Sequence, residues 1–156
     1  MAIPQPEDWQ PVARVAQLDR RPILAVQVFG QYFVLFRTKQ GNLGLILDGC
    51  AHLGVTLEPG WVEADRIRCG YHGWAYDIAG RCIDIPGDSS DWKDRFRLPA
   101  YPAREAGGIV WAYGGTEDEP ELCPLEELLR VHGAAVPDSE AGDKPPRYEN
   151  GAGVPD

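Results

Sequence analysis

The stretch CAHLGVTLEPGWVEADRIRCGYHGW, residues 50–74, contains two of the chain's four cysteines and two of its three histidines. Cys50 and His52 are separated by one residue, Cys69 and His72 by two, and sixteen residues lie between the pairs. Thiolate sulfur and imidazole nitrogen are ligands for zinc and for iron–sulfur clusters. The stretch therefore predicts a metal site built from two ligand pairs on two loops.

The mixed composition of each pair distinguishes between the candidate metals. Structural zinc sites usually combine a Cys-Cys pair with a separate His-His pair, whereas each pair here holds one Cys and one His. A Rieske [2Fe–2S] centre needs two Cys on one iron and two His on the other, so each loop supplies one ligand to each iron. We expect Gly60, Gly70 and Gly73 to give the loops room to approach the cluster.

The longer stretch CAHLGVTLEPGWVEADRIRCGYHGWAYDIAGRCIDIP closely resembles the Rieske domain of aromatic ring-hydroxylating oxygenases, especially the phthalate-dioxygenase type. The resemblance covers roughly residues 8–116 and includes the opening WQPVARV. It implies a [2Fe–2S] cluster in which Cys50 and Cys69 bind one iron and His52 and His72 bind the other.

Three further positions separate this type from the high-potential respiratory Rieske proteins. Val55 and Tyr71 stand where the respiratory type has two disulfide-bonded cysteines, and Trp74 stands where it has a serine that donates to a sulfide. Tyr76 is retained as a donor to a ligand sulfur, so Trp74 and Tyr76 are supporting residues. Fewer donors stabilise the reduced cluster less, and we predict a potential of about −150 mV.

The three histidines indicate where electrons leave the cluster and whether the chain can hold a second iron site. The resemblance implies that His52 and His72 expose their second ring nitrogens, which predicts electron exit and redox-linked proton exchange there. Full-length oxygenases of this kind add a mononuclear iron held by two His and one carboxylate. Only His132 remains for that role, so we expect no catalytic residues in this chain, and we expect His132 to be an exposed residue at a helix end.

The rest of the sequence predicts a mainly β fold of the antiparallel sandwich or barrel type, with a small cluster-binding subdomain at about residues 49–87. The segments expected to be strands are short and separated by turn residues: 23–29, 31–37, 43–48, 66–68, 74–78, 82–85, 97–104 and 108–113. Pro124–His132 is expected to form a short helix that ends before Gly133.

Composition and charge divide the chain in two. It has 156 residues, with 18 glycines and 14 prolines, which suits one loop-rich domain followed by a tail. Residues 1–116 carry 13 acidic and 12 basic side chains, whereas residues 117–156 carry 11 and 3. We expect a Rieske domain over 1–116 and an acidic tail over 117–156, which is either solvated and irregular or a docking arm for a basic partner.

Several partner classes and compartments are disfavoured. The charge distribution has no basic footprint for nucleic acid. We find no secretory signal and no apolar run of about 20 residues, so we expect a cytoplasmic protein without a membrane anchor. Thiols stay reduced in that compartment, which favours metal binding by the clustered cysteines over disulfide formation.

Other residues of chemical interest are expected to be structural. Cys82 is predicted to be a buried thiol and Cys123 a partly exposed bystander. Asp84 and Pro86 are supporting positions near the cluster. The remaining aromatic residues are expected to contribute to packing, with Trp74 also shielding the cluster: Trp61, Trp74, Tyr76 and Trp111.

Three functions are compatible with these features. The first is electron transfer from a flavin-dependent reductase to a separate oxygenase catalytic part, with this chain as a subunit or a severed N-terminal domain. The second is an independent Rieske ferredoxin that serves another acceptor, and the third is a structural metal-binding module. The sequence names no substrate, because substrate selection in the resembling family belongs to the catalytic domain.

Overall fold

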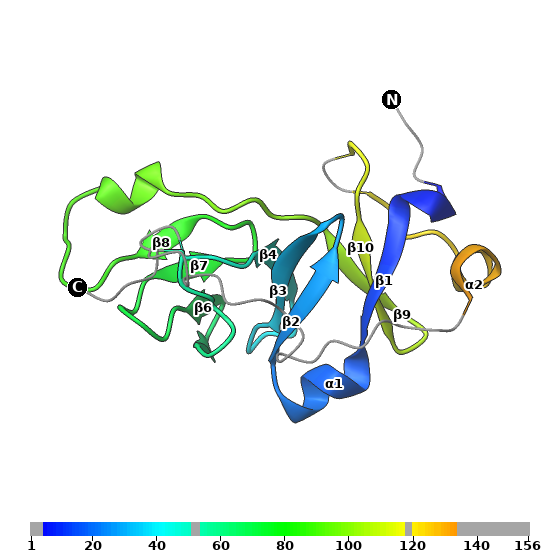
Figure 1. Cartoon of the computed structure of the whole chain (residues 1–156), viewed down its shortest axis with the longest axis horizontal. Helices are drawn as coiled ribbons and strands as arrows, with labels where there is room; N and C mark the ends of the chain where they lie inside the picture. The colour runs from blue at the N-terminus through cyan, green and yellow to red at the C-terminus, as the bar shows by residue number, and fades with distance from the viewer. Residues whose placement is uncertain (1–4, 51–53, 118–119, 134–156) are drawn as a thin grey trace.

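The computed structural model describes residues 5–50, 54–117 and 120–133, and its fold is mainly β, as predicted. Three antiparallel sheets follow one another along the molecule, and a short helix packs at one end (Figure 1). The helical elements are η1 (Pro6–Asp8), α1 (Val15–Arg20), η2 (Trp92–Arg95) and α2 (Leu125–His132).

The first sheet has the strand order β1-β10-β9, with β1 at Trp9–Arg14, β10 at Ile109–Tyr113 and β9 at Ala103–Ala106. β1 is an edge strand, which accommodates Pro11 because an edge position needs no donor on the solvent side. Its register shifts between Pro11 and Ala13, so the strand bulges at the proline.

The second sheet, in the order β2-β3-β4, is built from β2 (Ile23–Val28), β3 (Gln31–Arg37) and β4 (Leu43–Leu47). Val28 pairs with Gln31, so Phe29 and Gly30 form a two-residue hairpin loop. Both loop residues have positive φ, 54° and 75°, as the tight turn of a twisted hairpin requires.

The third sheet, in the order β5-β6-β7-β8, lies next to the two loops that we expect to supply the metal ligands, called the ligand loops below. Its strands have three residues each: β5 (Trp61–Glu63), β6 (Arg66–Arg68), β7 (Ala75–Asp77) and β8 (Cys82–Asp84). This sheet lies at the end of the molecule opposite α2, with β2, β3 and β4 between them (Figure 1). The second loop connects β6 to β7, whereas the first follows β4 and ends before β5.

Three apolar clusters form the core. The largest joins the second and third sheets, with Val34, Phe36 and Ile46 packed with Ile67 and Tyr76. This cluster also contains Cys50 and Cys69, so the two thiols that we expect to bind metal border a packed core. A third cluster forms where α2 buries Leu128 against Trp9 and Trp111, so α2 is part of the folded body.

The strand positions agree with the sequence predictions at most places, and one segment is wrong. We predicted a strand over residues 97–104, but β9 begins at Ala103, and residues 97–102 form only isolated bridges at Arg97 and Ala100. Pro99 and Pro102 lack the N–H donors that a ladder needs, which explains the difference. The sequence analysis also missed β1, α1 and the three-residue β5.

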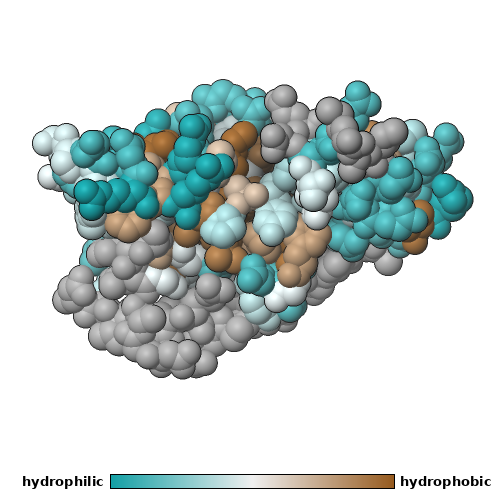
Figure 2. Space-filling model, turned by 90° about the horizontal axis from the view of Figure 1, so that it is seen from above, coloured by the Kyte–Doolittle hydropathy of each residue, from teal (hydrophilic) through white to brown (hydrophobic). Residues whose placement is uncertain are grey.

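The surface of the described residues is mixed in character. On the face in Figure 2, hydrophobic side chains gather over the middle and hydrophilic ones over both ends. The large apolar side chains with the highest exposure are scattered over several elements: Phe29, Trp61, Ile78, Trp92 and Val131. Within the described ranges, no helix has the length and apolar character needed to cross a membrane.

Candidate metal centre

The first ligand loop begins at Cys50, three residues after the end of β4. The Cys50 thiol is 2% exposed. The Cys50 N–H donates to the Val55 carbonyl at 2.8 Å, and the Gly54 N–H donates to the Cys50 carbonyl at 2.7 Å. These two bonds hold Gly54 and Val55 against Cys50. His52, the expected second ligand of this loop, lies outside the described residues.

A buried carboxylate anchors this loop, and the sequence analysis did not single it out. Asp48 is fully buried and accepts the Thr56 hydroxyl at 2.8 and 3.0 Å and the Leu57 N–H at 2.7 Å. The two sides of the loop are therefore joined through one side chain. Only tertiary structure could reveal this role, because Asp48 alone looks like an ordinary residue at the end of a strand.

The second ligand loop is a compact turn between β6 and β7. The Cys69 N–H donates to the Trp74 carbonyl at 2.7 Å, and the Gly73 N–H donates to the Cys69 carbonyl at 3.1 Å. Gly73 has a φ of +81°, and a Cβ there would lie 3.0 Å from the Pro86 ring. Pro86, predicted to be supporting, therefore packs against this turn.

The two loops bring Cys50 and Cys69 together. The thiols share a hydrogen bond, which is the main reason why the pKa of Cys69 is lowered to about 6. Burial acts in the opposite direction, and the N–H groups of Tyr71 and His72 lower the Cys69 pKa further. The structure thus favours a thiolate at Cys69, and thiolate is the form that binds iron.

Both sulfur atoms have hydrogen-bond donors close by. The Tyr76 hydroxyl lies 3.1 Å from Cys50 Sγ, and Tyr76 is fully buried within β7. The Tyr71 N–H points to Cys69 Sγ at 3.5 Å. Tyr76 is therefore where the sequence analysis expected a donor to a ligand sulfur.

His72 is exposed, and the Tyr71 ring stacks on it with a centroid distance of 4.1 Å and an interplanar angle of 22°. Tyr71 in turn packs against the largest core cluster. The imidazole is thus held between solvent and a side chain fixed by the core. Such a position leaves one edge of the ring accessible from outside.

The glycines act mainly where the loops meet each other. A Cβ at Gly60 would collide with the Arg68 carbonyl oxygen, and a Cβ at Gly70 would lie 3.3 Å from the Pro59 carbonyl oxygen. The small residues thus allow a close backbone-to-backbone approach, and the room that we expected them to give toward the cluster stays a prediction. This approach brings the end of the first loop against the start of the second.

Trp74 is buried behind the second loop, with 4% exposure. Its ring makes edge contacts with Trp92 and Phe96 at centroid distances of 5.4 and 5.0 Å. The expected packing role is confirmed for Trp74, Tyr76 and Trp111, but it is wrong for Trp61. Trp61 is 47% exposed, with its indole N–H bound to Glu63 at 2.7 Å.

Cys82 packs in the same apolar cluster as Cys50 and Cys69, whereas Leu122, Cys123 and α2 pack around Trp9 and Trp111. All four cysteines are within the described residues, and none forms a disulfide. Cys82 is buried, which raises the pKa of its thiol, and Cys123 is half-buried, both as expected. The expected exposure of His132 is wrong: it is half-buried, and its Nε2 lies 2.8 Å from the Pro6 carbonyl oxygen.

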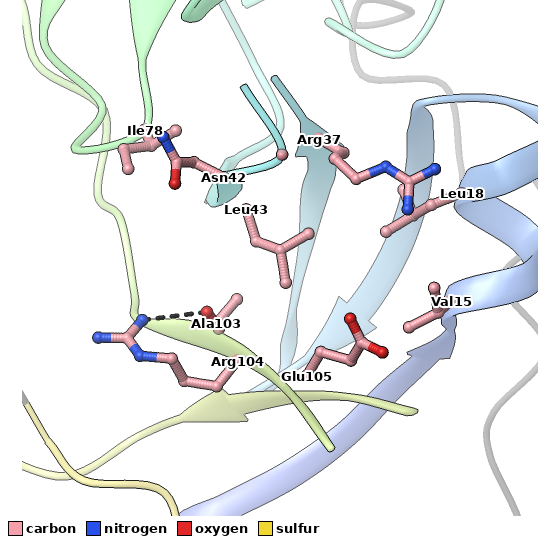
Figure 3. Close-up of a pocket in the computed structure, with 10 residues that line it drawn as sticks. Val15, Leu18, Arg37, Asn42, Leu43, Ile78, Ala103, Arg104 and Glu105 are labelled. Atoms are coloured by element: carbon pink, nitrogen blue, oxygen red, sulfur yellow. Dashed lines mark hydrogen bonds between the residues drawn. The ribbon is translucent and has the colours of Figure 1, made fainter. Parts of the chain in front are cut away.

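A separate cavity of about 340 Å³ lies between α1, the β3–β4 turn and β9 (Figure 3). Arg104 and Glu105 reach it from β9, and Arg104 Nη1 donates to the Ala103 carbonyl at 3.0 Å. Its ten lining residues all belong to the described ranges, and none is a cysteine or a histidine. The cavity is therefore not part of the candidate metal centre.

Comparison with known proteins gives consistent results. The model of the Rieske [2Fe–2S] domain family matches residues 8–102. The chain is 36% identical over 130 residues to the 5,5'-dehydrodivanillate O-demethylase oxygenase subunit of a Sphingobium species, covering 80% of this chain and 31% of that protein. It is 36% identical over 122 residues to the phthalate 4,5-dioxygenase oxygenase subunit of Pseudomonas putida, covering 74% and 28%.

Solved structures agree with these relatives. A complex of the carbazole 1,9a-dioxygenase oxygenase, carrying one Ile-to-Leu replacement, with ferredoxin matches at a TM-score of 0.62 and 30% identity, covering 72% of this chain and 30% of that one. The chain thus spans about 30% of the length of the curated relatives it matches.

Proposed function

This chain belongs to the Rieske [2Fe–2S] domain family, and from that premise we propose that it carries electrons to a ring-hydroxylating oxygenase. Cys50 and Cys69 bind one iron of the cluster, and His52 and His72 bind the other. The observation that carries the proposal is the meeting of two separate loops at the Cys50 and Cys69 thiols, with the Tyr76 hydroxyl 3.1 Å from Cys50 Sγ.

The donor set fits the cluster. The structure pairs two thiols at a buried position, lowers the pKa of Cys69 to about 6 and supplies donors to both sulfurs. When bound, the cluster takes up and releases one electron at a time. Tyr76 donates to the Cys50 sulfur, Trp74 excludes water from behind the second loop, and the exposed His72 is the exit toward an acceptor.

We place the potential near the low end of the Rieske range, about −150 mV. Among the described residues, the Tyr76 hydroxyl lies 3.1 Å from one sulfur, and the Tyr71 N–H, which is long at 3.5 Å, and the His72 N–H act on the other. Few donors leave the additional negative charge of the reduced cluster less stabilised. A low potential suits an electron delivered onward to an iron that activates oxygen.

The relatives support an oxygenase partner. They are oxygenase subunits, and one solved relative is in complex with a ferredoxin. We propose that this chain receives electrons from a flavin-dependent reductase or a ferredoxin. It passes them to a mononuclear iron on a separate polypeptide or on another part of a longer protein. The ligand thiols require a reducing compartment, for which we propose the cytoplasm.

We also propose that the Rieske domain occupies residues 1–116, with its cluster-binding subdomain at about 49–87, and that residues 117–156 form an acidic extension. The family match over 8–102 supports the first part. Leu128 is fully buried against the domain, so the α2 part of the extension packs on it.

The test is an anaerobic electron-transfer experiment on the protein purified with its bound cluster. NADH and a phthalate-dioxygenase-type flavin reductase should bleach its visible absorbance. Adding an oxygenase catalytic part with an intact mononuclear iron and an empty cluster site should restore the colour. Reduction without transfer to any oxygenase part would favour an independent ferredoxin. A colourless protein with bound metal and no redox response would favour a structural module and overturn the proposal.

A further inference from the structure

The residue immediately before Cys69 is an arginine with an unusual number of fixed contacts. The Arg68 side chain is 14% exposed. Its Nε and Nη2 donate to the two carboxylate oxygens of Glu63, both at 3.0 Å. Its Nη1 donates to Asp84 at 2.8 Å and to the Gly73 carbonyl oxygen at 2.5 Å. The side chain thus donates hydrogen bonds to three partners at once.

These partners belong to three different parts of the third sheet. Glu63 lies on β5, Asp84 lies on β8, and Gly73 is in the second ligand loop. Arg68 immediately precedes Cys69, and Gly73 immediately follows His72. The guanidinium therefore closes a ring around both expected ligands of the loop, and the two carboxylates fix that guanidinium to the two edge strands of the sheet, β5 and β8.

The positive charge of Arg68 compensates two carboxylates. Glu63 and Asp84 are both acidic, and the Arg68 cation lies between them. The hydrogen bonds to Arg68 are the first reason why the pKa of Glu63 is lowered, and the pKa of Arg68 is raised mainly by Glu63. A planar guanidinium can donate two hydrogen bonds to one carboxylate and further ones to a second carboxylate and a carbonyl. A lysine ammonium lacks the geometry to bind all three groups in this way.

Resting on the proposed ligand set, we infer that Arg68 is a positioning residue of the metal centre. By holding the Gly73 carbonyl against β5 and β8, it keeps Cys69 and His72 at the separation that two irons of one cluster need. The residue touches neither iron nor sulfide in this role. It acts through the backbone of the turn.

The test compares Arg68→Lys with Arg66→Lys in the full chain. Arg66 lies on the same strand and the same face, but its ion pair is to Asp65, an exposed neighbour, at 3.0 Å. Both changes keep the charge. Cluster loss is followed as bleaching of the visible absorbance during incubation with an iron chelator, and the reduced cluster is recorded by electron paramagnetic resonance.

We expect Arg68→Lys to lose its cluster about tenfold faster than the wild type, as the loss of one charge-assisted hydrogen bond would give. Its resonance lines should also broaden or shift, because the ligand geometry is no longer fixed. Arg66→Lys should stay within about twofold of the wild type, since an exposed ion pair contributes little.

A stability control separates positioning from general destabilisation. Leu128→Ala removes a fully buried side chain on α2, at the end of the molecule opposite the ligand loops. If Leu128→Ala matches Arg68→Lys in both bleaching rate and resonance line shape, the effect is global and the inference is wrong. A wild-type bleaching rate and spectrum in Arg68→Lys would overturn it as well.

The remaining outcomes separate a failure of this inference from a failure of the proposed function. If Arg68→Lys does not fold, Asp84→Asn weakens one contact of the same guanidinium and should bleach at a rate between wild type and tenfold faster; an unchanged rate would refute the role. If the wild-type chain itself holds no iron and sulfide, the proposed function fails. If it holds them and Arg68→Lys is unaffected, only the inference about Arg68 fails.

Discussion

Replacing Tyr76 by phenylalanine should lower the midpoint potential of the cluster. The hydroxyl lies 3.1 Å from Cys50 Sγ, and the residue is fully buried, so water cannot easily take its place. A sulfur bound to iron carries no proton, so the hydroxyl is the donor. Phenylalanine keeps the ring in the core and removes only this bond.

The size of the shift follows from how differently the bond stabilises the two oxidation states. A hydrogen bond to a charged group contributes about 1.5–3 kcal/mol. Only the part that differs between the oxidised and reduced cluster changes the potential, and we take that part as about 1 kcal/mol. For a one-electron couple a tenfold change, or about 1.4 kcal/mol, corresponds to about 59 mV, so the expected decrease is about 40 mV.

The assay is a spectroelectrochemical titration of the wild type, Tyr76→Phe and a matched control, Tyr113→Phe. Tyr113 is also buried, at 2% exposure, but its hydroxyl accepts the Glu117 N–H at 3.1 Å and lies in the cluster of apolar residues around α2. The control should leave the potential within about 10 mV of wild type. An unchanged or higher potential in Tyr76→Phe would refute the assigned role of its hydroxyl.

Four other changes test the contacts that support the loops. Gly60→Ala should destabilise the protein by about 2 kcal/mol or more in urea unfolding, because the new Cβ collides with the Arg68 carbonyl; a wild-type midpoint would contradict the close approach of the loops. Asp48→Ala should lower the free energy of unfolding by about 2–3 kcal/mol, since it leaves the buried Leu57 N–H without this acceptor. Thr56→Val should lower it by less. Glu63 has a pKa lowered from 4.5, so its ion pair stabilises the fold above that pH and is lost as the pH falls through the lowered pKa. The stability difference between wild type and Glu63→Gln should therefore be constant above about pH 5.5 and shrink below pH 4.5; a constant difference down to pH 3 would argue against the Glu63 pairing.

The family and its type of cluster could be predicted because the Cys and His residues follow a local spacing. Two Cys-His pairs with a fixed separation restrict the possible metals strongly, and the hairpin at Phe29–Gly30 is likewise encoded by a short turn between apolar runs. The helix at Leu125–His132 followed from Pro124 and Gly133 at its ends.

The parts that escaped prediction depend on contacts between distant segments. Arg68 looks like one of several charged residues on a short strand until Glu63, Asp84 and the Gly73 carbonyl surround it. His132 looks like an exposed helix end until its ring contacts Trp111 and the Pro6 carbonyl.

The most direct test of the central claim is a count of iron and acid-labile sulfide in the natively purified full chain. The account predicts two irons and two sulfides per chain, because a Rieske centre holds one [2Fe–2S] cluster on two Cys and two His. Finding zinc with no labile sulfide would contradict it and would make the two loops a structural metal site. A third iron that arrives on a second polypeptide would identify the oxygenase part to which this chain delivers electrons.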